Sequence, residues 1–417
     1  MKKSIRPWLV LAASFILMFT TIGLGANGLS LLYKPVAEAL NFSQTKFNLY
    51  YTIATLAGLV ASPIAGKIFS KKFSSARLYI IIGGVINLAC FVAYSFCRTL
   101  PQFYIASFFR GVGTSLISAT PATMLINEWF VEKRSTATSI AFMGSSAGGL
   151  VYTQISKFLL NTYGWQTAYW GMGVVSFVTI IIVVILAVPT PDQANAKPYG
   201  YDKLNEAGSE AAQNRWQGLT AGQALKTAQF WIMCIAMFIG SVVVMGVQQC
   251  VASSLMEDFA YSDAVAAGVV SVFMVFICVG KLVIGWIFDK AGVKTGLIYS
   301  CVLLVVSMVC MILAKNIVMA YAFAVAFGLG NMTSTVISTT MTSTTFGTKE
   351  YGTIYGTVTM FMTGGMSIGP VVSGAVFEKF GSYQNAWILY AAASVVTTAL
   401  LVLVNALSKK LKEKYPA

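Results

Sequence analysis

The chain has 417 residues, of which 57% are hydrophobic and 10% are charged, and its mean hydropathy is +0.74. Lysine and arginine outnumber aspartate and glutamate by 28 to 14, and histidine is absent. Soluble domains carry about 25% charged residues, so this composition excludes an ordinary soluble protein and indicates an integral membrane protein.

Apolar stretches long enough to cross a bilayer follow one another along the whole chain, because roughly twenty such residues span it as a helix. We expect twelve of them, near residues 8–32, 46–68, 77–97, 101–127, 136–160, 166–188, 228–256, 264–288, 294–314, 316–344, 352–377 and 385–407. The first follows basic residues as a signal peptide would, but about 25 residues exceed a signal h-region, so we expect it to be retained. The predicted fold class is therefore an all-α membrane protein with twelve transmembrane helices.

The placement of positive charge predicts the orientation, because lysine and arginine gather on the cytoplasmic side of short loops. With the N-terminus inside, twenty of the 28 basic residues fall on that side, six fall outside, and Arg110 and Lys281 lie within apolar stretches. We expect both termini in the cytoplasm and the protein in the cytoplasmic (plasma) membrane. The net charge of +14 then reflects topology and contact with membrane lipid, and we expect no nucleic-acid partner.

The chain reads as two similar six-helix halves. We expect one half over residues 1–190, another over 227–417, and a polar cytoplasmic linker over 191–226 with a short surface helix around 204–216. Glycines recur between the halves: Gly111 and Gly113 as Gly328 and Gly330, Gly148 as Gly365, and Gly66 as Gly285. Such internal repeats indicate a transporter whose substrate binds near the midplane between the halves.

The fourth and tenth helices are rich in hydroxyl groups, since ten of the fifteen residues 331–345 are serine or threonine. Every third helix, by contrast, is almost wholly apolar and suits lipid contact. A single serine or threonine in a membrane helix more often serves packing than binding. Taken together, the pattern favours a polar cavity lined by some helices and shielded by others.

Two basic residues, Arg110 and Lys281, lie deep in apolar stretches that contain no acidic residue. A cation near the bilayer centre costs roughly 2.5 to 3.5 kcal/mol on insertion scales, so it usually faces a cavity where a negative group can join it. We expect that group to be the substrate. Two other interpretations are open. The side chain of Lys281 could extend along its helix so that its ammonium group reaches the cytoplasmic surface. Arg110 could have a structural role by donating hydrogen bonds to backbone carbonyls.

The loop after the eighth helix reads Gly285-Trp-Ile-Phe-Asp289-Lys290-Ala-Gly292-Val-Lys294 and resembles the GxxxD[RK]xGx[RK] loop of the major facilitator superfamily. The first-half copy reads Gly66-Lys-Ile-Phe-Ser70-Lys71-Lys72-Phe73, with serine in place of the acid. The resemblance implies a cytoplasmic gate in which a loop carboxylate braces against a helix N-terminus. It implies these gating residues: Gly66, Lys71, Gly285, Asp289, Lys290 and Gly292. Asp289 would brace near Ser135, and the Ser70 side would depend on its neighbouring lysines and packing.

A second resemblance covers residues 129–168. Trp129-Phe130-Val-Glu-Lys133-Arg134-Ser-Thr-Ala137, the glycines that follow and Tyr163-Gly164-Trp165 are similar to the monocarboxylate and oxalate/formate porter branch of that superfamily. This branch has a cation, usually arginine, four residues before the loop glycine, and the cation is thought to bind the substrate carboxylate. Lys281 stands at that position. Lysine acts as a point charge, whereas arginine offers two parallel hydrogen bonds. Lysine in place of arginine therefore keeps the expected class of substrate, a carboxylate, but defines less closely which carboxylate binds.

We therefore expect a secondary-active carrier of small organic anions, such as oxalate, formate, lactate or pyruvate, that works by alternating access as a monomer. The candidate substrate-binding residues are Lys281, Arg110, Asn27, Tyr152, Gln154, Gln248, Asn331 and Tyr355, with Tyr50, Tyr51 and Gln249 as further lining. We expect no enzyme activity, metal or cofactor, because the seven cysteines show no CxxC spacing and nothing assembles a nucleophile or paired acids.

The mechanism depends on where the acids lie. All fourteen aspartates and glutamates fall outside the expected spans, and Ile277 stands where proton-coupled relatives carry an acid. Proton-coupled carriers generally need a titrating group inside the membrane. We expect exchange of one anion for another, or uniport. Proton symport stays open through the protonated substrate or a titrating Lys281. A multidrug exporter of the same fold and a ligand-sensing receptor are further alternatives.

Overall fold

The computed structural model describes residues 5–201 and 218–415, apart from the side chains of residues 26, 27, 45, 409 and 410. The surface helix expected around residues 204–216 lies outside this part. The chain forms two compact units: residues 1–215 with 350–357, and residues 216–349 with 358–417. Each unit is described by itself.

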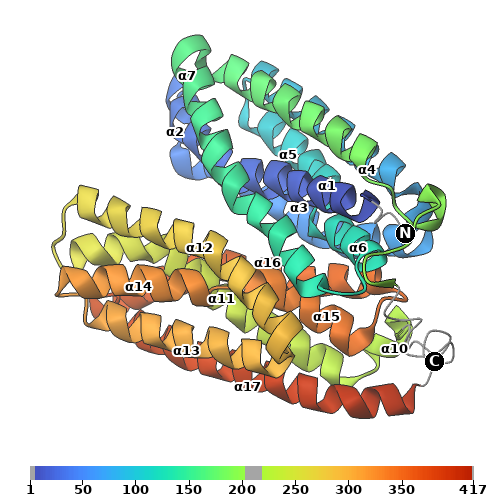
Figure 1. Cartoon of the computed structure of the whole chain (residues 1–417). Coiled ribbons are helices and arrows are strands. Elements are labelled where there is room, and N and C mark those ends of the chain that lie inside the picture. Colours follow the sequence, from blue (N-terminus) through green and yellow to red (C-terminus); the bar gives the residue numbers. More distant parts are fainter. Residues whose placement is uncertain (1–4, 202–217, 416–417) are drawn as a thin grey trace. The chain divides into compact units, whose positions relative to one another are not determined.

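The described part of the first unit is built from α-helices and three short helical segments of other types (Figure 1). They are α1 (Arg6–Gly23), the π-helical η1 (Leu24–Gly28), α2 (Ser30–Ala39), α3 (Gln44–Lys71), η2 (Phe73–Ser75), α4 (Ala76–Phe96), α5 (Leu100–Leu116), α6 (Ala119–Trp129), α7 (Arg134–Leu186) and η3 (Asp192–Ala194). Helix α1 packs against α7 and α6, α3 packs against α5, and α4 packs against both α5 and α7.

The second unit repeats this plan of packed helices. They are α10 (Ala221–Leu225), α11 (Ala228–Glu257), α12 (Asp263–Ala291), α13 (Val293–Ile312), α14 (Ile317–Gly330), the π-helical η4 (Thr333–Ile337), α15 (Ser338–Phe346), α16 (Tyr351–Phe380) and α17 (Gln384–Lys414). Helix α14 packs against α12 and α13, and α17 packs against α11 and α13. The first seven residues of α16 belong to the first unit.

The twelve predicted membrane helices are confirmed. Ten helices of the described residues are long and apolar enough to cross a membrane. One of them, α7, is two helices joined at Gly164, whose φ of +81° is not helical. The remaining span is α5 followed by α6, which breaks at Ile117 and Ser118 and is therefore too short in either piece to qualify alone.

The repeated glycines make equivalent contacts in the two units. A Cβ on Gly111 would collide with the carbonyl of Ala54 on α3, and a Cβ on Gly328 would collide with that of Phe273 on α12. In the same way, one on Gly148 would meet the carbonyl of Phe19 on α1, and one on Gly365 that of Phe238 on α11. Because only glycine permits such close backbones, the repeat read from the sequence marks equivalent helix crossings.

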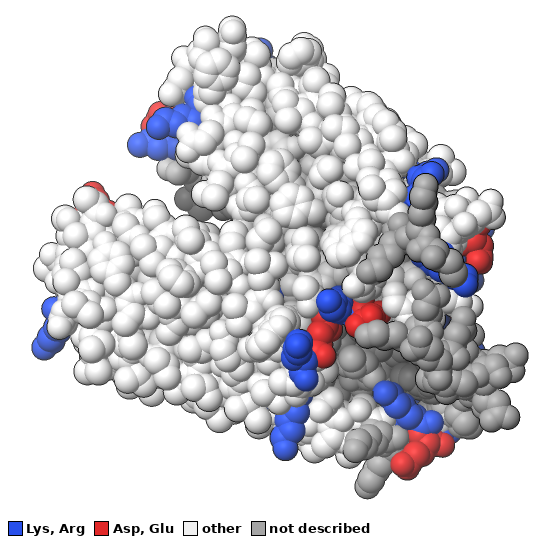
Figure 2. Space-filling view, in the orientation of Figure 1, with Lys and Arg blue, Asp and Glu red and all other residues white. Residues whose placement is uncertain are grey.

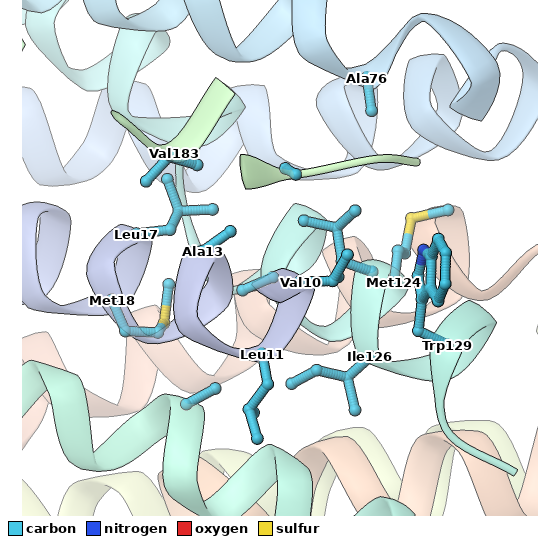
Figure 3. Close-up of a cluster of buried hydrophobic side chains, with 14 of the residues drawn as sticks. Val10, Leu11, Ala13, Leu17, Met18, Ala76, Met124, Ile126, Trp129 and Val183 are labelled. Atoms are coloured by element: carbon cyan, nitrogen blue, oxygen red, sulfur yellow. The ribbon is translucent and has the colours of Figure 1, made fainter. Parts of the chain in front are cut away.

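A core of buried apolar side chains holds the first unit together (Figure 3). Leu17 and Val10 from α1, Ile126 and Trp129 from α6, and Val183 from α7 all lie in it with at most 1% exposure. The indole nitrogen of Trp129 donates to the carbonyl of Val188 at 2.7 Å, which satisfies its one polar atom inside the core. The core thereby fixes α1, α6 and α7 against one another.

The helix flanks carry few charges. On the face that Figure 2 shows, uncharged atoms cover the helices, and blue and red atoms gather near helix ends and loops. The helices expected to contact lipid expose apolar side chains: Leu78, Ile82 and Val85 on α4, Val178, Ile181 and Ile185 on α7, Val302, Val306 and Val309 on α13, and Val395 and Val396 on α17. Exposed apolar flanks of this kind suit a hydrocarbon environment.

Candidate functional site

Two charged side chains are buried among the described residues, Arg110 in α5 and Lys281 in α12, with 6% and 3% exposure. No aspartate or glutamate of the described part is buried with them. A buried charge is costly unless an opposite charge or several hydrogen bonds stabilise it. Arg110 and Lys281 are therefore the positions at which a charge interrupts the otherwise uncharged interior of the described part of each unit.

Tyrosine hydroxyls surround Arg110. Its main electrostatic neighbours are Tyr94, Tyr50, Tyr33 and Tyr51, and all of them belong to the first unit. We call these four residues and Tyr169 the tyrosine cluster. The Nε atom of Arg110 is itself buried and has no hydrogen-bond partner within the described part of the chain. The guanidinium is therefore close to neutral tyrosines and has one donor atom, Nε, that no described residue satisfies.

Rings in contact hold the tyrosine cluster in place. Their centroids lie 5.4 Å apart for Tyr33 and Tyr50, 6.0 Å for Tyr33 and Tyr51, and 5.5 Å for Tyr50 and Tyr94. The hydroxyls of Tyr50 and Tyr169 lie 3.1 Å apart. Tyr50, Tyr94 and Tyr169 are fully buried, whereas Tyr33 and Tyr51 are half-buried at the edge. Aromatic contacts of this size stabilise a fixed arrangement, so the inner hydroxyls are held in position.

Lys281 lies where α12 crosses the end of α14. The preceding residue, Gly280, approaches the carbonyl of Gly328, the backbone of Leu329 and the side chain of Met332 so closely that a Cβ would collide with them. Helix α14 ends at Gly330, and Asn331 leaves helical geometry with φ −78° and ψ 67°. Asn331 is buried at 6% exposure. Lysine and asparagine thus belong to the same helix crossing, beside a break in the tenth membrane helix.

The fourth and tenth membrane helices are both interrupted. Ser118 adopts extended geometry, with φ −87° and ψ −162°, between α5 and α6. Asn331 interrupts the tenth helix directly after Gly330, the glycine equivalent to Gly113. Discontinuous membrane helices leave backbone groups free and are tolerated where protein or a water-filled cavity can satisfy them. Ser300 satisfies one such group by donating to the carbonyl of Gly330.

The other predicted site residues are distributed as follows. Tyr152 is fully buried, and its hydroxyl lies 3.5 Å from that of Thr179. Gln154 and Gln249 are exposed, and Gln248 is half-buried. Tyr355 is buried at 1% exposure and stacks on Tyr351 with ring centroids 5.3 Å apart. The side chain of Asn27 lies outside the described residues.

Of the predicted residues, the first unit brings together Arg110, Tyr50 and Tyr51. In the second unit Gly280, the residue before Lys281, packs against residues on both sides of Asn331. Tyr33, Tyr94 and Tyr169 were not among the predicted site residues. One signal for Tyr94 exists: α4 and α5 form a hairpin, which places Tyr94 beside Ser107, with their oxygens 2.6 Å apart. Nothing in the spacing signals Tyr169, because it comes from the distant α7.

The first copy of the gating loop packs on the start of α16 within the first unit. A Cβ on Gly66 would collide with the carbonyl of Gly352. Ser70 Oγ accepts a hydrogen bond from the backbone N–H of Thr353 at 3.1 Å. Thr353 is in the first turn of α16, so a neutral hydroxyl satisfies one of the unpaired N–H groups of that helix N-terminus.

The remaining gating residues lie at helix ends. Lys71, Asp289 and Lys290 are exposed, and Gly285 is buried. Gly292 begins α13 with φ +82°, a conformation that favours glycine. No three histidine, cysteine, aspartate or glutamate side chains of the described residues gather as they would around a metal ion.

Comparison with known proteins identifies the family. The model of the Major Facilitator Superfamily matches residues 13–253 and 249–417. Human monocarboxylate transporter 2 is 21% identical over 423 residues, which covers 98% of this chain and 87% of that protein. Mouse monocarboxylate transporter 11 is 29% identical over 40% of this chain and 37% of its own length. The uncharacterized transporter ESBP6 of Saccharomyces cerevisiae is 27% identical over 46% of this chain and 28% of its own length.

Solved structures agree on the fold. The superfamily transporter FucP in the outward conformation has a TM-score of 0.67 at 14% identity, covering 95% of this chain and 98% of that one. The human organic anion transporter MFSD10 has a TM-score of 0.67 at 13% identity, also covering 95% and 98%. At such identities the likeness shows the fold alone, which is the fold of two six-helix halves predicted from the sequence. The chain belongs to the Major Facilitator Superfamily.

Proposed function

We propose that this protein carries small organic anions across a membrane, with mono- or dicarboxylates such as oxalate, formate, lactate or pyruvate as substrates. The observation that supports this proposal most directly is the sign of the buried charges. The charged side chains buried among the described residues are both cations, Arg110 and Lys281. A negatively charged substrate would supply the opposite charge that makes the burial of these cations favourable.

The relatives support the carboxylate class. Human monocarboxylate transporter 2 aligns with 98% of this chain, so the likeness is not confined to one motif. The shorter alignment with mouse monocarboxylate transporter 11, at 29% identity, falls in the same class by name. Substrate, direction and coupling are part of the proposal, because the identities are low.

We assign the carboxylate contact of the second unit to Lys281. A lysine that reached the membrane surface along its helix would expose its ammonium group, whereas Lys281 is 3% exposed. The helix crossing at Gly280 includes the end of α14, where Asn331 supplies an amide. An ammonium with an amide nearby can bind a carboxylate without a second charged residue.

We propose exchange of one anion for another by alternating access, with the two halves rocking around the substrate. Ile277, one turn before Lys281, is apolar and 8% exposed, so it offers no proton acceptor. A dedicated proton relay needs a titrating chain of side chains. We further propose a monomer in the cytoplasmic membrane, with both termini in the cytoplasm, without enzymatic activity or a cofactor.

Counterflow in proteoliposomes tests this function. Vesicles loaded with unlabelled oxalate, formate, lactate or pyruvate are diluted into the labelled anion, with and without a pH gradient. Exchange predicts uptake that requires internal anion and persists without the gradient. Uptake that follows the gradient and ignores internal anion would replace exchange by proton symport. No uptake of any carboxylate, together with uptake of organic cations, would overturn the proposed substrate class.

A further inference from the structure

Arg110 and its neighbours stand apart chemically from Lys281. Arginine stays protonated in proteins, so the cost of burying Arg110 cannot be relieved by losing a proton. Lysine can lose its proton when buried. The positive charge of the first unit is therefore permanent, and its stabilisation has to come from groups around it.

The tyrosine cluster gives only part of that stabilisation. Each hydroxyl oxygen can accept a hydrogen bond from the guanidinium, but a hydroxyl is neutral and leaves the net charge in place. The buried Nε atom has no hydrogen-bond partner among the residues that the structure describes. A guanidinium offers donors in a planar fork, and the edge that includes Nε matches the two oxygens of a carboxylate. The edge of Arg110 that includes this Nε atom thus has the chemistry of a carboxylate site.

The same tyrosines can serve both ions. A hydroxyl that accepts from Arg110 still has its own hydrogen to donate, and an anion beside the guanidinium is a strong acceptor. Tyr50, Tyr94 and Tyr169 are fully buried and held by one another and by Ser107. Tyr33 and Tyr51 are half-buried, so these two are the side chains of the cluster that a ligand would meet first.

We propose that Arg110, together with the hydroxyls of Tyr33 and Tyr51, forms an anion-binding site of the first unit that takes a small carboxylate without the help of Lys281. Every group of this site belongs to the first unit, from α2, α3 and α5. The inference rests on the proposed function in taking a carboxylate as the ligand. It goes beyond that function in giving the protein two anion sites, one in each unit.

Binding in the absence of Lys281 tests the proposal. The protein variant Lys281→Ala is purified in lipid nanodiscs, and binding of labelled formate is measured by scintillation proximity with unlabelled formate as competitor. We expect Lys281→Ala to keep a saturable formate site. Adding Arg110→Gln should weaken that site by at least about 10-fold, because a charge-assisted pair of hydrogen bonds is lost. A control, Arg98→Gln, removes an exposed arginine of the same unit and should leave binding unchanged.

Two further variants keep the test decisive if Arg110→Gln does not fold. Tyr33→Phe with Tyr51→Phe preserves both rings and the charge and should weaken formate binding about 3- to 10-fold through the lost hydroxyls. Arg110→Lys should retain binding of chloride, a spherical ion, better than binding of formate. Loss of all binding in Lys281→Ala alone, or equal binding in Lys281→Ala with and without the tyrosine changes, would overturn the proposal.

These outcomes are separable from those of the transport assay. If no carboxylate is transported but formate still binds in a way that depends on Arg110, the proposed function is contradicted and the proposed anion site at Arg110 stands. The opposite result is transport that depends on Lys281, with binding and uptake unaffected by changes at Arg110, Tyr33 and Tyr51. It would contradict the proposed site in the first unit and leave the proposed function standing.

Discussion

Lys281 and Arg110 show how two cations can be buried for different chemical reasons. Lys281 lies at a helix crossing where Gly280 lets α12 approach α14. Arg110 lies among aromatic rings whose hydroxyls face its charge. An ammonium is a compact charge with freely rotating donors, whereas a guanidinium is a planar fork. The substitutions that each position tolerates should therefore differ.

Replacement of Lys281 tests its contact with substrate. Lys281→Ala should lower carboxylate uptake roughly 10- to 100-fold, because a hydrogen bond between charged groups contributes about 1.5 to 3 kcal/mol. Lys281→Arg keeps the charge and should retain substantial uptake with an altered preference between monocarboxylates and oxalate. Initial rates of uptake into proteoliposomes measure both effects.

Lys315→Ala is the matched control for these rates, because Lys315 is an exposed lysine of the same unit. Its uptake should equal that of the unsubstituted protein. Full uptake by Lys281→Ala would remove Lys281 from the site and leave it a structural role at the crossing of α12 and α14.

At the scale of elements, glycines decide how closely the helices approach. Gly66 on α3 and Gly352 on α16 allow two backbones to meet with no side chain between them. Ser70 adds a hydrogen bond to Thr353 at the start of α16. In the second copy of the loop an acid, Asp289, stands at the equivalent position. The contact in the first unit is thus held by close packing and a neutral hydroxyl.

Substitution of Gly66 tests this contact. Gly66→Ala introduces a methyl group where the carbonyl of Gly352 lies, so α3 and the start of α16 would have to separate. We expect a cost of about 1 to 3 kcal/mol, as for overpacking in a core, seen as a lower thermal midpoint in detergent and slower uptake. Gly374→Ala is the control, because no atom lies within 4 Å of a Cβ there.

Two outcomes would contradict the importance of the contact between α3 and α16. An unchanged thermal midpoint and uptake rate in Gly66→Ala would show that the contact between α3 and α16 contributes nothing to the cycle. A loss in Gly374→Ala equal to that in Gly66→Ala would show that glycine is needed along the helices for a reason other than close approach.

At the scale of the whole molecule, orientation follows from where the charges end up. The described charged side chains other than Arg110 and Lys281 are not buried, and charges gather at helix ends and loops. Helix α17 continues to Lys414 and carries Lys412 and Lys414 in its last turn. Basic residues beside a membrane helix are retained on the cytoplasmic side and attract anionic lipid.

A reporter fusion tests the orientation. Alkaline phosphatase fused after Ala417 should be inactive in a bacterial host, and a fluorescent protein at the same place should fluoresce, because the predicted C-terminus is cytoplasmic. Fusions within the loop at Lys315 should give the opposite pair of results. High phosphatase activity at the C-terminus would reverse the predicted topology.

Much of the fold could be predicted from particular residues. The pair Gly111 and Gly328 indicated the repeat, and in the structure each lies at the equivalent crossing of its unit. The interruptions of the fourth and tenth helices were not predicted, because no proline or glycine adjoins Ile117 and Ser118, and Gly330 before Asn331 was interpreted as part of the repeat. Their departure from helical geometry depends on the helices packed around them.

Of the candidate site, the sequence by itself determined which residues are exceptional. Arg110 and Lys281 are cations within apolar stretches of the sequence that contain no aspartate or glutamate, so local composition was enough. Only the tertiary structure decided what surrounds them: four helices bring the tyrosine cluster together with Arg110 on a fifth, and α14 ends where α12 carries Lys281. The reason is physical, because hydropathy is a property of consecutive residues, whereas the hydroxyls near a buried charge come from helices far apart in the chain.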